Sequence, residues 1–189
     1  MAEREPQVKI ADMFTDRWSP RAFSSKPVKE SDLQCLFEAA RWAPSCYNEQ
    51  PWQFYYVTAD SPRHAKFVET LVDLNQSWAC NAPALIYIVG QNNFKYNSKA
   101  NPWSGFDTGA AWMSLALQAR QMDLYTHAMA GFKQNAAMKF LGLDKKTHTV
   151  YAAIAAGYLG DKSMLNTDLQ EKEEPSDRIS TAEFVYKIV

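Results

Sequence analysis

Residues 31–58 read SDLQCLFEAARWAPSCYNEQPWQFYYVT and predict a helix, a polar turn and a strand in direct succession. In the first part, apolar side chains recur at i, i+3, i+4 and i+7, namely at Leu33, Leu36, Phe37 and Ala40. This spacing indicates an amphipathic helix over residues 31–41, with Ser31 or Asp32 as its N-cap. Pro44 breaks the helical pattern, because proline lacks an N–H and restricts the residue before it. Residues 53–58 are aromatic and β-branched and favour a strand.

The rest of the chain repeats this interleaving of helix and strand. Helical patterns cover residues 61–74, 107–122 and 135–141, and strand patterns cover 85–89, 125–129, 150–158 and 184–189. The 107–122 segment has small or apolar side chains on most faces, which is typical of a helix packed closely against its neighbours. Residues 91–105 are polar and irregular, as in a long functional loop. Together the patterns predict an α+β protein.

Length and composition point to one ordinary globular domain. The chain has 189 residues, of which 47% are hydrophobic and 22% charged, and these values exclude a disordered chain. We therefore expect residues 1–189 to form a single domain. A net charge of -1 provides no global basic field for nucleic acid or for an anionic membrane surface. The longest apolar runs are too short to span a bilayer.

The cysteines and histidines predict neither disulfides nor a metal site. Cys35, Cys46 and Cys80 form an odd set without a CxxC pair, which favours a reducing, cytoplasmic location. The first ten residues lack the apolar segment of a signal peptide, which favours the same location. The histidines are His64, His127 and His148, and they stand far apart without a carboxylate partner at ligand spacing.

Glycine is too scarce for a glycine-rich phosphate loop, because the chain has only seven and neither GxGxxG nor GxxxxGK[ST] occurs. A phosphate would have to be held by cationic side chains and helix ends. Residues 17–23 read RWSPRAF, and an extended backbone would point Arg17, Ser19 and Arg21 to one side. Two guanidiniums and a hydroxyl suit a phosphate dianion, because arginine offers charge-assisted, often bidentate donors. The alternative is a solvated basic patch.

Three further features are richer in polar or small residues than their structural roles require. Residues 43–52 (APSCYNEQPW) carry a hydroxyl, a thiol and amides on a proline-stiffened turn, which suits the edge of a polar heterocycle. Ordinary turn chemistry gives a similar composition. Ala130-Gly131 follows an apolar strand, where a glycine lets backbone approach a ligand closely. Arg178, late in the chain, is a candidate third cation, with a plain surface charge as the alternative.

In combination these segments resemble the nitroreductase family of flavin enzymes. The resemblance rests on Arg17-x-Ser19-x-Arg21-x-Phe23, a helix, and Ala43-Pro44-Ser45-x-x-Asn48-x-Gln50-Pro51-Trp52 leading into a strand. It extends through the small-residue helix, Ala130-Gly131, Gly157-Tyr158 and Arg178, from about residue 12 onward. It implies a nitroreductase-like α+β fold, in which helices flank a central, mainly antiparallel sheet. It also implies an intertwined homodimer with FMN at its interface.

The resemblance also implies roles for individual residues. The phosphate and ribityl side of FMN would be bound by Arg17, Trp18, Ser19, Arg21 and Arg178. Pro44, Ser45, Cys46, Asn48 and Gln50 would reach the flavin from the partner subunit, and Asn75, Ala130 and Gly131 would lie near the isoalloxazine ring. Such enzymes pass a hydride from NAD(P)H through flavin N5 to a nitroaromatic, quinone or similar small acceptor in a ping-pong cycle. The protein then supplies binding and orientation, in agreement with the lack of an acid–base constellation in the sequence.

The chain departs from the family pattern at two positions. Many relatives have a lysine soon after the flavin-side amide, whereas Trp78 follows Asn75 here, which leaves open the source of positive charge near flavin N1/O2. Ser176 stands two residues before Arg178, where a basic residue is expected. Residues 91–105, with three aromatic side chains, are a candidate substrate lid.

Three alternative functions remain at the level of the sequence. A family relative acting on flavin itself or on halogenated aromatics would share the same motifs. A flavin-binding carrier or regulatory protein without turnover would lack access for a nicotinamide. A structural protein with an aromatic core, consistent with an aromatic content of 13%, would bind no flavin.

Overall fold

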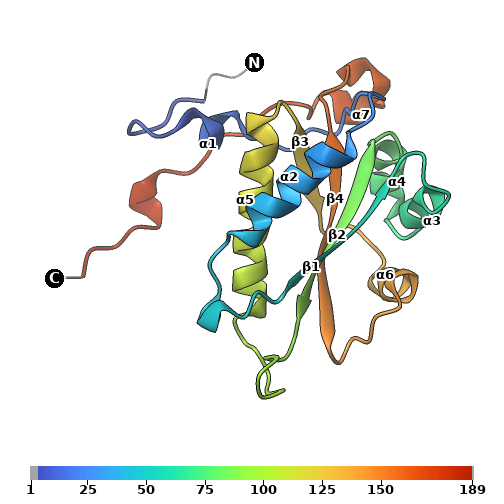
Figure 1. Ribbon diagram of the computed structural model, residues 1–189. Coiled ribbons are helices and arrows are strands. Elements are labelled where there is room, and N and C mark those ends of the chain that lie inside the picture. The colour runs from blue at the N-terminus through green and yellow to red at the C-terminus, as the bar shows by residue number, and fades with distance from the viewer. Residues whose placement is uncertain (1–3, 189) are drawn as a thin grey trace.

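The structure, a computed structural model, describes residues 4–188 and contains a four-stranded antiparallel sheet with helices on both faces (Figure 1). The strands are β1 (Trp52–Thr58), β2 (Ala84–Gln91), β3 (Tyr125–Met129) and β4 (His148–Gly157), in the spatial order β1-β2-β4-β3. The helices are α1 (Asp12–Asp16), α2 (Glu30–Arg41), α3 (His64–Glu69), α4 (Asp73–Ala79), α5 (Ser104–Gln121), α6 (Gln134–Leu141) and α7 (Thr167–Gln170). Short 3-10 helices cover Cys46–Asn48, Lys162–Met164 and Thr181–Glu183. The predicted α+β class and antiparallel sheet are confirmed.

Strand β2 joins two hydrophobic cores, because side chains on both of its faces are buried. It pairs antiparallel with β1 on one side and β4 on the other, so it is a central strand. Leu85, Tyr87 and Val89 belong to the core under α3, α4 and α6, whereas Ala84, Ile86 and Ile88 belong to the core under α2 and α5. This alternation follows from the two-residue period of a strand. A continuous apolar run is therefore what a strand covered on both faces requires.

Helices α2 and α5 cover one face of the sheet (Figure 1). Leu33, Leu36 and Ala40 of α2 are buried, as the helical spacing predicts. Helix α5 packs with Ala111, Leu115 and Ala119, whose four-residue spacing puts two alanines and a leucine on the buried face. The predicted N-cap was wrong. Helix α2 begins at Glu30 after Lys29, without a side-chain cap, so Ser31 and Asp32 already lie in its first turn.

Two predicted elements were also wrong. The single helix expected over 61–74 is two short helices, α3 and α4, separated at Thr70–Val72. Leu71 forms a β-bridge with Phe132, and the Val72 amide donates to the carbonyl of Gly131, so tertiary contacts interrupt the helix. The strand expected over 184–189 is not formed over 184–188, where the chain is exposed and unpaired within the described residues. Residue 189 lies outside the described range.

The N-terminal segment around Gln7 contacts the segment around Ser180, and the chain after it extends away from the sheet (Figure 1). Gln7 of the N-terminal segment donates to Ser180 Oγ over 3.0 Å, and it accepts from the backbone amide of Thr181 over 2.9 Å. Beyond this contact the C-terminal segment carries exposed apolar side chains, Phe184, Val185, Tyr186 and Ile188. A segment that exposes this much apolar surface is suited to lie against another protein surface.

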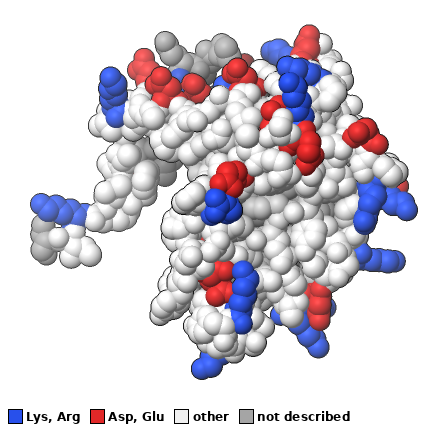
Figure 2. All heavy atoms as spheres, in the orientation of Figure 1, with Lys and Arg blue, Asp and Glu red and all other residues white. Residues whose placement is uncertain are grey.

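Charged side chains of both signs are mixed over the face drawn in Figure 2. This distribution agrees with the near-neutral net charge of -1. Of the helices in the described part of the chain, none combines the length and the apolar character needed to cross a bilayer.

Candidate functional site

Arginine side chains gather where α1 ends. Arg17 follows the last residue of α1 in extended conformation, and its Nη1 lies 3.5 Å from Ser19 Oγ. Burial lowers the pKa of Arg17, and the positive charges of Arg178 and Arg4 lower it further. The structure thus brings together Arg17, Ser19 and Arg178, three of the residues that the sequence assigned to a phosphate. It adds Arg4, which the sequence analysis did not identify because no local pattern marks it.

Arg21 is held by a buried acid that the sequence analysis missed. Glu173 Oε1 accepts from the backbone amides of Arg21 over 2.6 Å and Ala22 over 2.8 Å. The Arg21 guanidinium lies 3.5 Å from Glu173 Oε2, an ion-pair distance rather than that of a tight hydrogen bond. Glu173 therefore fixes the backbone of the RWSPRAF segment from a distant part of the chain. Nothing in the polar stretch around Glu173 distinguishes it from its solvated neighbours.

Asn75 and the Ala130-Gly131 turn, predicted from separate parts of the sequence, meet in the structure. Asn75 Nδ2 donates to the carbonyl of Gly131 over 2.9 Å, and the Val72 amide donates to the same oxygen over 3.1 Å. The contact is close enough that a Cβ atom at Gly131 would lie 2.5 Å from Asn75 Nδ2. The glycine is therefore required by close packing between α4 and the turn after β3.

His127 and Trp78 connect the RWSPRAF segment to helix α4, which carries Asn75. His127 Nδ1 lies 2.9 Å from the carbonyl oxygen of Pro20, and its ring centroid lies 4.7 Å from that of Trp78 in α4. A carbonyl only accepts, so Nδ1 carries the proton in the neutral ring. Burial lowers the pKa of His127 to about 4, which keeps the ring neutral. These contacts pack the RWSPRAF segment against edge strand β3 and helix α4. We call this surface of three adjoining elements the wall.

Trp18 lies at the start of this wall. Its ring packs edge-on against Tyr125, the first residue of β3, with ring centroids 6.1 Å apart. The Arg120 guanidinium covers the same tyrosine at 4.1 Å from the ring centroid. These contacts place the RWSPRAF segment beside the C-terminal end of α5.

The loop with Pro44, Ser45, Cys46, Asn48 and Gln50 lies beside the other end of α5. The Cys46 amide donates to Asp107 Oδ2 over 3.1 Å, in the first turn of that helix. Ser45 Oγ accepts from the Gln50 amide over 3.0 Å, which closes the loop on itself. Three of its residues, Tyr47, Asn48 and Gln50, have φ angles of 53°, 56° and 49°. Left-handed backbone at non-glycine residues costs energy and is concentrated at functional sites.

The Cys46 loop therefore does not meet the RWSPRAF segment within one chain. Helix α5 rises by about 20 Å between Asp107, which contacts the Cys46 loop, and Arg120, which contacts the wall near Trp18. A site that needs both groups has to combine residues from two copies of the chain.

The candidate lid is joined to the Cys46 loop. The connection between β2 and α5 spans residues 92–103, slightly shorter than expected. Its Phe94 and Tyr96 rings lie 6.4 Å and 6.5 Å from Tyr47, and Lys95 Nζ donates to the carbonyl of Glu49 over 3.0 Å. These contacts pack the 92–103 connection against the Cys46 loop.

Comparison with known proteins identifies the family. The family model described as "Nitroreductase family" matches residues 14–158, which is most of the chain. The chain belongs to the nitroreductase family. The match includes the RWSPRAF segment, the Cys46 loop, Asn75 and Gly131, and it ends before Arg178.

Individual relatives support the assignment at different levels. A solved structure described as an oxidoreductase containing FMN is 37% identical, covers 97% of this chain and 94% of its own, and has a TM-score of 0.92. The CLA biosynthesis enone reductase of Lactiplantibacillus plantarum is 24% identical over 87% of this chain and 92% of its own length. The nitrobenzene nitroreductase of Ectopseudomonas oleovorans is 36% identical over 28% of this chain. The chain spans less than half the length of two curated relatives that it matches, 45% and 23%.

This member of the nitroreductase family exposes aromatic and apolar side chains beside the Cys46 loop. Trp42 and Tyr47 are 74% and 82% exposed, and Trp103 and Phe106 at the start of α5 are 54% and 79% exposed. Met113 continues the same side of α5 two turns later. Exposed aromatic and apolar side chains gathered in this way are typical of a protein interface.

Proposed function

We propose that this chain is an FMN-dependent oxidoreductase that takes electrons from NAD(P)H and passes them to a nitroaromatic, quinone or similar small acceptor. The gathering of Arg17 and Arg178 is the observation that carries the proposal. Arg17 is partly buried and the nearby positive charge of Arg178 lowers its pKa, so this arrangement favours a bound anion. The terminal phosphate of FMN has the right charge for two arginine forks.

The residues present fit the remainder of FMN as well. The hydrogen bond from Asn75 Nδ2 to the Gly131 carbonyl holds α4 and the turn after β3 together, at the place where the family resemblance puts the isoalloxazine ring. His127 is kept neutral and orients the Ser19–Arg21 backbone through the Pro20 carbonyl. When bound, FMN would supply the hydride chemistry between NAD(P)H and the acceptor, in a ping-pong cycle. The protein binds, orients and excludes water.

We propose further that the working unit is an intertwined homodimer in which Pro44, Ser45, Cys46, Asn48 and Gln50 complete the site of the other subunit. The separation of about 20 Å along α5 within one chain supports this arrangement. So do the exposed aromatic residues beside the loop and the projecting apolar C-terminal segment. In a two-fold dimer the same pair of surfaces forms both sites.

A cytoplasmic location is the third part of the proposal. The three cysteines are unpaired, and Cys35 and Cys80 are exposed. Exposed free thiols are suited to a reducing compartment.

The first test is an absorbance spectrum of the purified protein before and after anaerobic addition of NADH or NADPH. A visible flavin spectrum that bleaches is the expected result. A flavin spectrum that persists with both donors would favour the carrier without turnover. A colourless protein that also ignores added FMN would refute the proposal.

The shared site has a test of its own. Arg17→Ala and Asn48→Ala each damage a different half of the site, so each homodimer should be inactive. Co-expressed with different tags, equal amounts of the two chains form heterodimers in half of all dimers. Each heterodimer has one intact site, and about a quarter of wild-type activity should return. Activity no higher than that of the two homodimers would contradict a site shared between subunits.

A further inference from the structure

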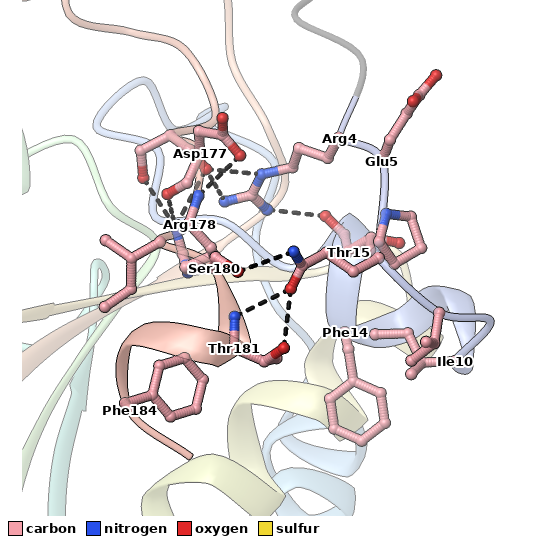
Figure 3. Close-up of a pocket in the computed structure, with 15 residues that line it drawn as sticks. Arg4, Glu5, Ile10, Phe14, Thr15, Asp177, Arg178, Ser180, Thr181 and Phe184 are labelled. Carbon is pink, nitrogen blue, oxygen red and sulfur yellow. Dashed lines mark hydrogen bonds between the residues drawn. The ribbon is translucent and has the colours of Figure 1, made fainter. Parts of the chain in front are cut away.

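Arg4, in the N-terminal segment, joins the two parts of the chain that carry the phosphate-site arginines. Its Nε and Nη2 both donate to the carbonyl of Ser176, over 3.0 Å and 2.7 Å. Its Nη1 donates to the carbonyls of Thr15 over 2.7 Å and Arg17 over 2.8 Å. Figure 3 shows the guanidinium between the end of α1 and the segment around Asp177.

The partners of Arg4 stand immediately beside the side chains that would bind the anion. One of the carbonyls belongs to Arg17 itself, and the other side of the fork lies on Ser176, two residues before Arg178. A planar guanidinium with donors on both edges can bridge two backbone segments in this way, whereas a lysine ammonium cannot hold the same geometry.

Charge makes this position unfavourable without an anion. Burial and the neighbouring Arg178 lower the pKa of Arg4, and Asp177 offsets part of that effect. The charge of Arg4 beside Arg17 and Arg178 is therefore repelled in the absence of an anion. A dianion bound nearby would make the electrostatic energy of Arg4 favourable instead.

We infer that Arg4 is a positioning residue for the phosphate of the flavin nucleotide, because it clamps the Arg17 and Arg178 segments together. This inference rests on the proposed function. Arg4 thereby supplies positive charge beside Ser176, from a segment more than 170 residues away in sequence.

The test compares FMN with riboflavin, which lacks the phosphate, as ligands of the apoprotein. Flavin fluorescence gives both dissociation constants without turnover. For Arg4→Ala we expect a roughly ten-fold or larger rise in the dissociation constant of FMN and little change for riboflavin. Arg4→Lys keeps the charge but not the fork, so its FMN affinity should lie between those of wild type and Arg4→Ala.

Gln7→Ala is the matched control, because Gln7 also ties the N-terminal segment to the C-terminal one, through Ser180 and Thr181, without a charge. Its preference for FMN over riboflavin should equal that of wild type. Circular dichroism establishes that each variant is folded, and Arg4→Gln replaces Arg4→Ala if the alanine variant is not.

The outcomes separate this inference from the proposed function. An Arg4 variant that keeps the wild-type preference for FMN, or loses both flavins equally, overturns the role of Arg4 and leaves the phosphate site standing. A wild-type protein that binds FMN no tighter than riboflavin overturns the phosphate site itself, and the role of Arg4 with it.

Discussion

Replacing Gly131 with alanine tests the contact between α4 and the turn after β3. The added Cβ would lie 2.5 Å from Asn75 Nδ2 and 2.9 Å from Val72 Cγ2. Both atoms are the ends of side chains, so we expect these side chains to move while the backbone stays. Asn75 then loses its 2.9 Å hydrogen bond to the Gly131 carbonyl.

The expected loss of stability follows from these two displacements. A lost hydrogen bond costs about 0.5–1.5 kcal/mol, and side chains forced away from their rotamers cost a similar amount. Gly131→Ala should therefore lower the free energy of unfolding by about 1–3 kcal/mol. Asn75→Ala is the matched comparison, because it removes the same hydrogen bond without adding a Cβ at Gly131. It should lower the free energy of unfolding by about 0.5–1.5 kcal/mol.

Urea unfolding followed by tryptophan fluorescence measures both changes. All samples need the same protomer concentration, because the stability of a dimer depends on it. Flavin titration adds a second measurement, in which Gly131→Ala should bind FMN and riboflavin more weakly by the same factor. If Gly131→Ala unfolds like wild type, the close contact of Asn75 with Gly131 is refuted.

Three further predictions concern the pH dependence, a buried acid and the C-terminal segment. Because the pKa of His127 is about 4 in the folded state and 6.5 unfolded, its contribution of about 3 kcal/mol is complete above pH 6.5 and is lost as the pH falls toward 4. His127→Gln should flatten that part of the stability profile, and an unchanged slope would contradict the assigned burial. Glu173→Ala should destabilise the protein by about 2–4 kcal/mol, because the amides of Arg21 and Ala22 lose their acceptor. Glu173→Gln keeps an acceptor, so equal losses in denaturant melts would argue against these bonds. Deletion of residues 184–189 should shift the proposed dimer toward monomer in sedimentation velocity, and an unchanged sedimentation coefficient distribution would rule out a role of this segment in assembly.

Periodicity predicted the elements whose burial is regular. The run LIYIV at 85–89 predicted the central strand β2, and YTHAM at 125–129 coincides with β3. Helices α2 and α5 followed from apolar spacing and small residues. The helix over 61–74 failed because the backbone of Leu71 and Val72 bonds instead to the turn at 131–132, a partner that no local pattern reveals. The strand predicted over 184–189 is not formed over 184–188, because this segment runs away from the sheet and pairs with neither edge strand, β1 or β3.

The candidate site was predictable where its residues form a local motif. Arg17, Ser19 and Gly131 carry their own signals in residue type and spacing, whereas Asn75 followed only from the family resemblance. Arg4, Glu173 and His127 carry none, because each acts through a backbone carbonyl or amide of a residue distant in sequence. Such contacts depend on how segments pack, and any polar residue in a loop has the same local appearance.

The sequence by itself determined the fold class, the family resemblance and the chemistry of the groups that could hold a flavin phosphate. Local spacing suffices for these, because a helix face, a strand face and an arginine motif are all encoded within a few neighbouring residues. Only the tertiary structure decided which groups meet. It put Asn75 against Gly131 and Arg4 beside Arg17, and it separated the Cys46 loop from the arginine cluster by the length of α5. Distances across a folded chain are set by packing between elements, and no single segment contains that information.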